Sequence, residues 1–90
     1  MKRYHLIVKG RVQGVGFRWF CMNYANSLGV TGTVENLDNG DVEIYMQGDK
    51  EALNEFFARI IKGDRYIDVR DYEIEEVPVE EEERVFDYRW

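Results

Sequence analysis

The stretch that decides the fold of this 90-residue sequence runs from residue 8 to residue 18 and reads VKGRVQGVGFR. Before it, residues 4–9 are rich in branched and aromatic side chains and alternate between two faces, which predicts a strand with Leu6 and Val8 facing the core. From Phe17 onward, apolar residues recur at helical spacing, which predicts a helix that ends at Gly29. A turn with three glycines therefore joins a strand directly to a helix.

The rest of the chain continues this alternation. Strands are predicted at residues 30–37, 42–47, 67–77 and 85–90, and a second helix at Lys50–Lys62 between Asp49 and Gly63. Asn39-Gly40 is typical of a hairpin turn between two of these strands. The order predicts an α+β fold of the ferredoxin-like split βαβ type, with a short closing strand. We expect one antiparallel sheet with both helices on one face and a solvated opposite face.

Length and composition predict one domain, residues 1–90, that folds around a single core. No apolar run approaches the ~20 residues of a membrane helix, and the basic N-terminus lacks the apolar stretch of a signal peptide, so we expect a cytoplasmic protein. A single cysteine, Cys21, excludes an internal disulfide framework, and one histidine with one cysteine offers little to a transition metal. Because one core uses the apolar residues, we expect a monomer.

Charge is unevenly spread along the chain. The formal net charge is −6, but residues 1–34 contain no Asp or Glu and carry +5, whereas residues 35–90 carry −11. The acidic total argues against binding to a nucleic-acid backbone. The basic first third is suited to a local site for a small anion.

The glycine-rich turn is the place for such a site. Successive backbone N–H groups before a helix can point into one concavity, and a helix N-terminus favours anions. Arg18 is unfavourably placed in the first helical turn unless an anion binds there, and its guanidinium suits phosphate or carboxylate. The Walker motif and the dinucleotide-binding motif both fail, because Phe17-Arg18 follows Gly16 and Trp19 replaces the last glycine. The alternative interpretation is that this glycine-rich segment only forms a turn between the strand and the helix and binds nothing.

Together with residues 32–43, GTVENLDNGDVE, this stretch resembles the two motifs of the acylphosphatase family. The likeness covers essentially the whole chain, although Asn39 replaces the usual Asp of the second motif and the prolines often found after Gly63 are missing. The resemblance implies hydrolysis of a small acyl phosphate to a carboxylate and inorganic phosphate. It also implies that Asn36 positions the attacking water. The phosphate would be held by Arg18 and by the backbone of Arg11, Val12, Gln13, Gly14, Val15, Gly16 and Phe17.

Elementary chemistry is consistent with that assignment. The leaving carboxylate has a conjugate acid with a pKa of roughly 4, so it departs without a general acid. Positioned N–H donors and one guanidinium can stabilise phosphoryl transfer, so we expect neither a metal nor a cofactor. Asn36 can orient a water but is too weak a base to ionise it, which leaves the substrate phosphate to take the proton.

Two other functions are compatible with the same order of elements. One is an RNA-binding module, which shares the split βαβ order, but here Glu43, Glu73 and Glu75 lie on the expected open face of the sheet. The other is a silent anion sensor or a former part of a larger carbamoyl-transfer protein. The two site residues also have interpretations without a function. Arg18 could be an ordinary surface arginine, and Asn36 could only form the turn at the end of its strand. We interpret Glu80–Glu83 as a solvated loop.

Overall fold

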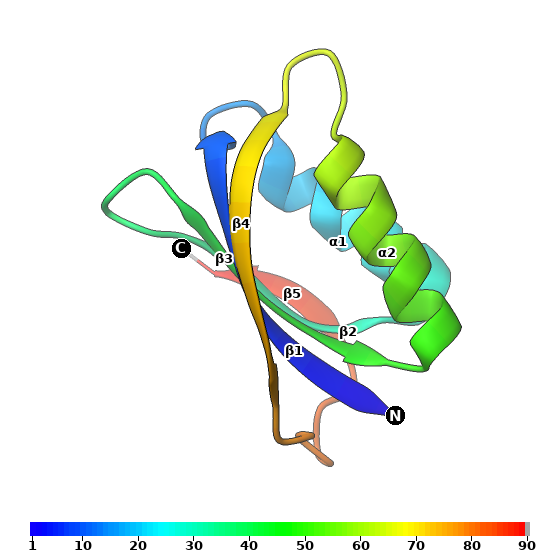
Figure 1. Cartoon of the computed structure of the whole chain (residues 1–90). Helices are drawn as coiled ribbons and strands as arrows, with labels where there is room; N and C mark the ends of the chain where they lie inside the picture. The colour runs from blue at the N-terminus through cyan, green and yellow to red at the C-terminus, as the bar shows by residue number, and fades with distance from the viewer. Residues whose placement is uncertain (90) are drawn as a thin grey trace.

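Two helices pack on one face of a five-stranded sheet with the strand order β4-β1-β3-β2-β5 (Figure 1). The computed structural model describes residues 1–89. In chain order the elements are β1 Lys2–Arg11, α1 Phe17–Leu28, β2 Thr31–Asn36, β3 Val42–Gly48, α2 Lys50–Lys62, β4 Asp68–Val77 and β5 Phe86–Arg89. Neither helix has the length and apolar character needed to cross a membrane.

The predicted order of elements is confirmed, and the two helices begin and end where the sequence places them. Gly29 ends α1 in a left-handed conformation, φ 74°, and its N–H donates to the carbonyl of Ala25. The Asn39-Gly40 turn also forms, with the Asn39 side chain accepting a hydrogen bond from the backbone of Asp41 at 3.0 Å. Local sequence signals therefore determine these boundaries.

The closing strand departs from the antiparallel arrangement, because β5 runs parallel to β2. The other pairs of strands are antiparallel, so the sheet as a whole is mixed. The chain leaves β4 at one edge of the sheet, passes across its end and returns along the opposite edge (Figure 1). Strand β2 runs opposite to β4, because three antiparallel pairings separate them. Since β5 also runs opposite to β4, it lies parallel to β2. Of the predicted closing strand, Trp90 lies outside the described residues.

The core lies between the helices and the inward face of the sheet. Leu6 and Ile44 from the sheet and Phe17 and Phe56 from the helices are buried there. Burial of each such side chain contributes about 1.5–3 kcal/mol. Cys21 is fully buried in the same core, as the helical spacing predicts, and this burial raises the pKa of its thiol. These contacts fix α1 against the sheet and so fix the segment that precedes it.

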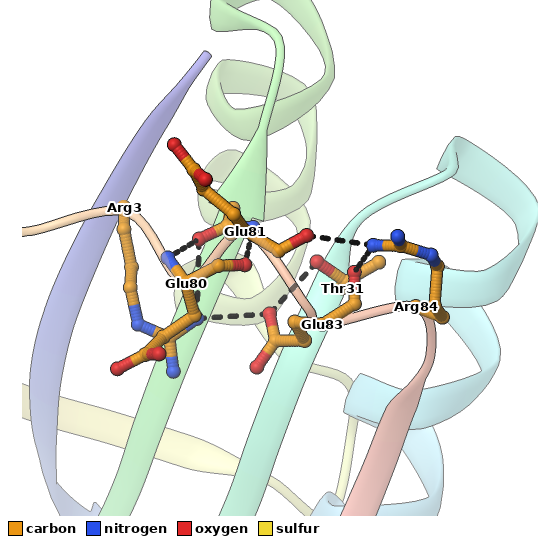
Figure 2. Close-up of polar contacts among 7 residues, drawn as sticks. Arg3, Thr31, Glu80, Glu81, Glu83 and Arg84 are labelled. Carbon is orange, nitrogen blue, oxygen red and sulfur yellow. Dashed lines mark hydrogen bonds and ion pairs between the residues drawn. The ribbon is translucent and has the colours of Figure 1, made fainter.

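On the outer face of the sheet, the loop after β4 is exposed at residues 80–82, as the sequence predicts, but it is attached to the sheet through Glu83 and the backbone of Glu80 (Figure 2). The Nη1 of Arg3, a residue only 7% exposed, donates to Glu83 Oε1 at 2.8 Å, and Thr31 Oγ1 donates to the same oxygen at 2.8 Å. The Gln47 side chain exchanges two hydrogen bonds with the backbone of Glu80, at 2.8 and 3.0 Å. We call the side chains of Arg3, Thr31, Gln47 and Glu83 the clasp.

The clasp explains why Gln47 is buried although it lies on the face expected to be solvated. The loop covers that end of the sheet and leads directly into β5. The N–H of Gly32 donates to the carbonyl of Val85 at 3.0 Å, which continues the attachment to the residue immediately before β5. A four-residue edge strand is thereby held against β2 from its N-terminal end.

We predict that Glu83→Ala lowers the free energy of unfolding by about 2 kcal/mol, because it leaves the buried Arg3 guanidinium without its carboxylate. Urea unfolding followed by circular dichroism measures the change. The matched control is Glu82→Ala, an exposed carboxylate of the same loop, which should change stability by less than about 0.5 kcal/mol. Equal effects of the two substitutions would contradict the role of the clasp.

Candidate active site

A hollow of about 190 Å³ lies at the end of the sheet where the β1–α1 loop meets the last residue of β2 and the side chain of Tyr88 from β5. Its lining comes from the sheet on one side and from the first turn of α1 on the other. The lining residues are Val12, Gly14, Gly16, Phe17, Arg18, Trp19, Asn36 and Tyr88.

The loop that borders the hollow has a backbone suited to anion binding. Gly14 and Gly16 have φ of 73° and 80°, in the left-handed region that glycine adopts without strain. Among residues 1–89, no hydrogen bond occupies the backbone N–H groups of residues 13–17. Gly16 caps α1 without a side-chain bond, and the first turn of the helix has no acidic residue. A helix N-terminus of this kind attracts negative charge.

Arg18 is held beside this loop by the closing strand. Its Nη1 donates to the carbonyl of Arg89 at 2.9 Å, and its guanidinium carbon lies 5.4 Å from the centre of the Tyr88 ring. A guanidinium stacked on an aromatic face keeps its plane fixed while its N–H groups point outward from the ring edge. Strand β5 therefore orients the positive charge at the hollow.

Asn36 ends β2 and forms part of the sheet side of the hollow. Its Oδ1 is buried and has no hydrogen-bond partner among the described residues. A buried carbonyl without a donor costs about 1–3 kcal/mol, so this oxygen is an unsatisfied side-chain acceptor at the site. Such an acceptor is suited to a water molecule that the protein itself does not supply.

Gln13 connects the two halves of the site. Its Nε2 donates to the carbonyl of Leu37 at 2.7 Å and to the carbonyl of Asp41 at 2.8 Å. The first of these carbonyls belongs to the residue after Asn36, so one side-chain amide joins the glycine-rich loop to the turn that follows β2. No role was predicted for this side chain, because nothing in the neighbouring sequence indicates a contact across 24 or 28 residues.

Of the residues expected in the phosphate site, six line the hollow and three do not. Arg11 is exposed at the end of β1 and pairs with Asp68 of β4. Val15 packs against the hydrophobic core, and the Gln13 side chain reaches the turn after β2. The residues that line it are Val12, Gly14, Gly16, Phe17, Arg18 and Asn36. Sequence reasoning did not assign Trp19 or Tyr88 to the site.

The other polar clusters lie on the outer face of the sheet, away from this lining. His5 Nε2 lies 2.8 Å from Glu43 Oε2, and its ring packs against Tyr45. Lys9 pairs with Asp41 at 2.9 Å, and this hydrogen bond raises the pKa of the lysine. In residues 1–89, no group of three His, Cys, Asp or Glu side chains is arranged to hold a metal ion.

Comparison with known proteins agrees with both the fold and the glycine-rich loop. The sequence model of the acylphosphatase family matches residues 4–88. An acylphosphatase of Clostridium acetobutylicum is 43% identical over 86 residues, which cover 96% of this chain and 94% of that protein. The crystal structure of acylphosphatase from Bacillus subtilis superposes with a TM-score of 0.94 at 37% identity and covers 100% of both chains.

The same fold also occurs within a longer protein. A crystal structure of full-length HypF in a phosphate- and nucleotide-bound form matches 99% of this chain with a TM-score of 0.86 and 27% identity, although the match covers 12% of the HypF chain. In contrast, the match to the Bacillus subtilis enzyme covers the whole of both chains. On the family match and on the identity to relatives along nearly its whole length, this chain belongs to the acylphosphatase family.

Proposed function

We propose that the protein hydrolyses small acyl phosphates to a carboxylate and inorganic phosphate, with the reaction taking place in the hollow beside Arg18. Relatives named acylphosphatase support the activity. The observation that carries the site assignment is the combination of backbone N–H groups without intramolecular acceptors and a guanidinium fixed next to them. Such donors are suited to bind a phosphoryl group, because its three oxygens carry negative charge and accept hydrogen bonds.

The phosphoryl group binds to Arg18 and to the backbone N–H groups of residues 11–17. Because these donors are fixed before the substrate arrives, they need little reorganisation when charge develops on the phosphoryl oxygens. Gly14 and Gly16 allow the backbone to approach the anion closely. In this arrangement the protein supplies position and electrostatic stabilisation, which is what phosphoryl transfer requires.

The attacking water is oriented by the Asn36 amide. The water oxygen forms a bond to phosphorus while the bond between phosphorus and the acyl oxygen breaks, and that electron pair leaves with the carboxylate. Rotation about χ2 of an asparagine is broad and roughly two-fold, so a half-turn presents the unpartnered Oδ1 to the hollow. The water proton passes to a phosphoryl oxygen, because an amide is too weak a base to keep it.

The protein acts as a single domain and a monomer in the cytoplasm, without a nucleic-acid partner. Support for this comes from the outer face of the sheet, where the carboxylates of Glu43, Glu73 and Glu75 would repel a phosphate backbone. The apolar side chains of both helices meet the sheet in one core.

We predict that Arg18→Ala weakens binding of inorganic phosphate at least about 10²-fold, whereas Asn36→Ala binds phosphate normally but turns over benzoyl phosphate about 10²-fold more slowly. Calorimetric titration with phosphate and a steady-state assay separate the two effects. Arg70→Ala is the matched control, because this exposed arginine lies on β4 at the opposite edge of the sheet. Undiminished turnover by Asn36→Ala would remove Asn36 from the mechanism.

The pH dependence provides a second test. Since the sequence has one histidine, His5, and it lies on the outer face of the sheet beside Glu43, no imidazole is positioned to act in the hollow. We predict that kcat/KM for benzoyl phosphate is flat between about pH 5.5 and 7.5 and is unchanged by a chelator. A limb near pH 6.5 that His5→Gln abolishes would contradict the proposal.

Gln13→Met removes both hydrogen-bond donors with little change in side-chain length. We predict that kcat falls about tenfold because Asn36 and the phosphate loop lose their fixed separation. The inhibition constant of phosphate should stay within about twofold, since Arg18 and the loop still bind the anion. A lower melting temperature with unchanged kcat at a temperature where the variant is folded would show a purely structural role.

A further inference from the structure

Trp19 is the most exposed aromatic side chain in residues 1–89, at 63% of its full accessibility. It is the third residue of α1 and lines the hollow next to Arg18. Within the described part of the chain, its ring makes neither an aromatic contact nor a cation–π contact, and its indole N–H has no acceptor. A large apolar ring at the mouth of a polar site therefore has its contact surface available to a ligand.

The hollow is small and open on one side. Its volume of about 190 Å³ lies below the 300–1,000 Å³ of sites that surround a complete drug-sized ligand. Arg18 and the loop hold the phosphoryl group inside. The acyl group consequently extends to the rim, where Trp19 is exposed.

In-line attack also determines the side on which the acyl group leaves. The water on Asn36 and the departing acyl oxygen must lie on opposite sides of phosphorus. Asn36 belongs to the sheet layer at the end of β2, whereas Trp19 belongs to the helix layer at the start of α1 (Figure 1). With the water on the sheet side of the hollow, the acyl group leaves toward the helix side.

We propose that Trp19 forms an acyl-binding subsite that selects aryl and other bulky apolar acyl phosphates over acetyl phosphate. This inference rests on the proposed function, because it takes the phosphoryl group to be bound at Arg18. The centre of the Tyr88 ring lies 5.4 Å from the Arg18 guanidinium carbon, and Tyr88 lines the hollow. Trp19 supplies the adjacent apolar surface on which a phenyl ring of the substrate packs.

The first experiment compares benzoyl phosphate and acetyl phosphate as substrates for the wild-type protein, Trp19→Ala and Trp19→Phe. Loss of one aromatic contact corresponds to a two- to tenfold effect, so we expect Trp19→Ala to raise KM for benzoyl phosphate by about that factor. The subsite binds ground state and transition state alike, so kcat should change less than about twofold. KM for acetyl phosphate should be unchanged, and Trp19→Phe should restore most of the preference.

The matched control is Tyr66→Ala, which removes another highly exposed aromatic ring that does not line the hollow. It should leave the kinetics of both substrates unchanged. If Trp19→Ala impairs both substrates equally, the tryptophan acts on the shape of the phosphate site and the subsite is excluded. If Trp19→Ala alters neither substrate, the subsite is also excluded.

A binding experiment separates the subsite from the proposed reaction. Calorimetric titration with benzylphosphonate and methylphosphonate, which lack a cleavable acyl bond, should show two- to tenfold tighter binding of the benzyl compound by the wild-type protein. Trp19→Ala should bind the two equally. Preference for the benzyl compound without turnover of any acyl phosphate would overturn the proposed function but support the subsite. Turnover without this preference, or no binding of either phosphonate, would overturn the subsite.

Discussion

The side-chain amide of Gln13 lies between two carbonyl oxygens of a turn that is 24 to 28 residues further along the chain. Each carbonyl belongs to the segment that follows Asn36, and the amide belongs to the loop that precedes Arg18. These two hydrogen bonds connect the glycine-rich loop directly to the turn after β2, in addition to the packing of both segments on the hydrophobic core. Two hydrogen bonds from one nitrogen thus set the separation between the anion-binding backbone and the water-orienting side chain, and every later step of the proposed reaction depends on that separation.

Cations of the basic first third meet carboxylates along the sheet. On the outer face, Arg3 pairs with Glu83 and Lys9 pairs with Asp41, whereas Lys2 pairs with Glu76 on the helix side of the sheet. Arg18 lies beside the hollow, where a backbone carbonyl and an aromatic ring of β5 contact it. Carboxylates of the later sequence therefore neutralise cations along the sheet, and Arg18 lies next to the anion-binding loop.

Sequence patterns predicted what is locally encoded and missed what depends on distant contacts. The period of α1 from Phe17, the hairpin at Asn39-Gly40 and the inward orientation of Leu6 and Val8 in β1 follow from neighbouring residues and are confirmed. The parallel direction of β5 and the burial of Gln47 depend on a loop crossing the sheet, which no local pattern reports. The family resemblance likewise indicated Arg18, Asn36 and the loop backbone but gave no contact for the side chain of Gln13 or for Trp19.

The attachment of β5 has a consequence for biosynthesis. Arg18 and Asn36 leave the ribosome early, but the strand that orients the guanidinium consists of residues 86–89. Because β5 pairs with β2 across a long sequence separation, its docking is a slow, non-local step compared with formation of the helices and the hairpin. The carbonyl of Arg89 and the ring of Tyr88 can therefore orient the Arg18 guanidinium only after the last strand has been synthesised and has paired with β2.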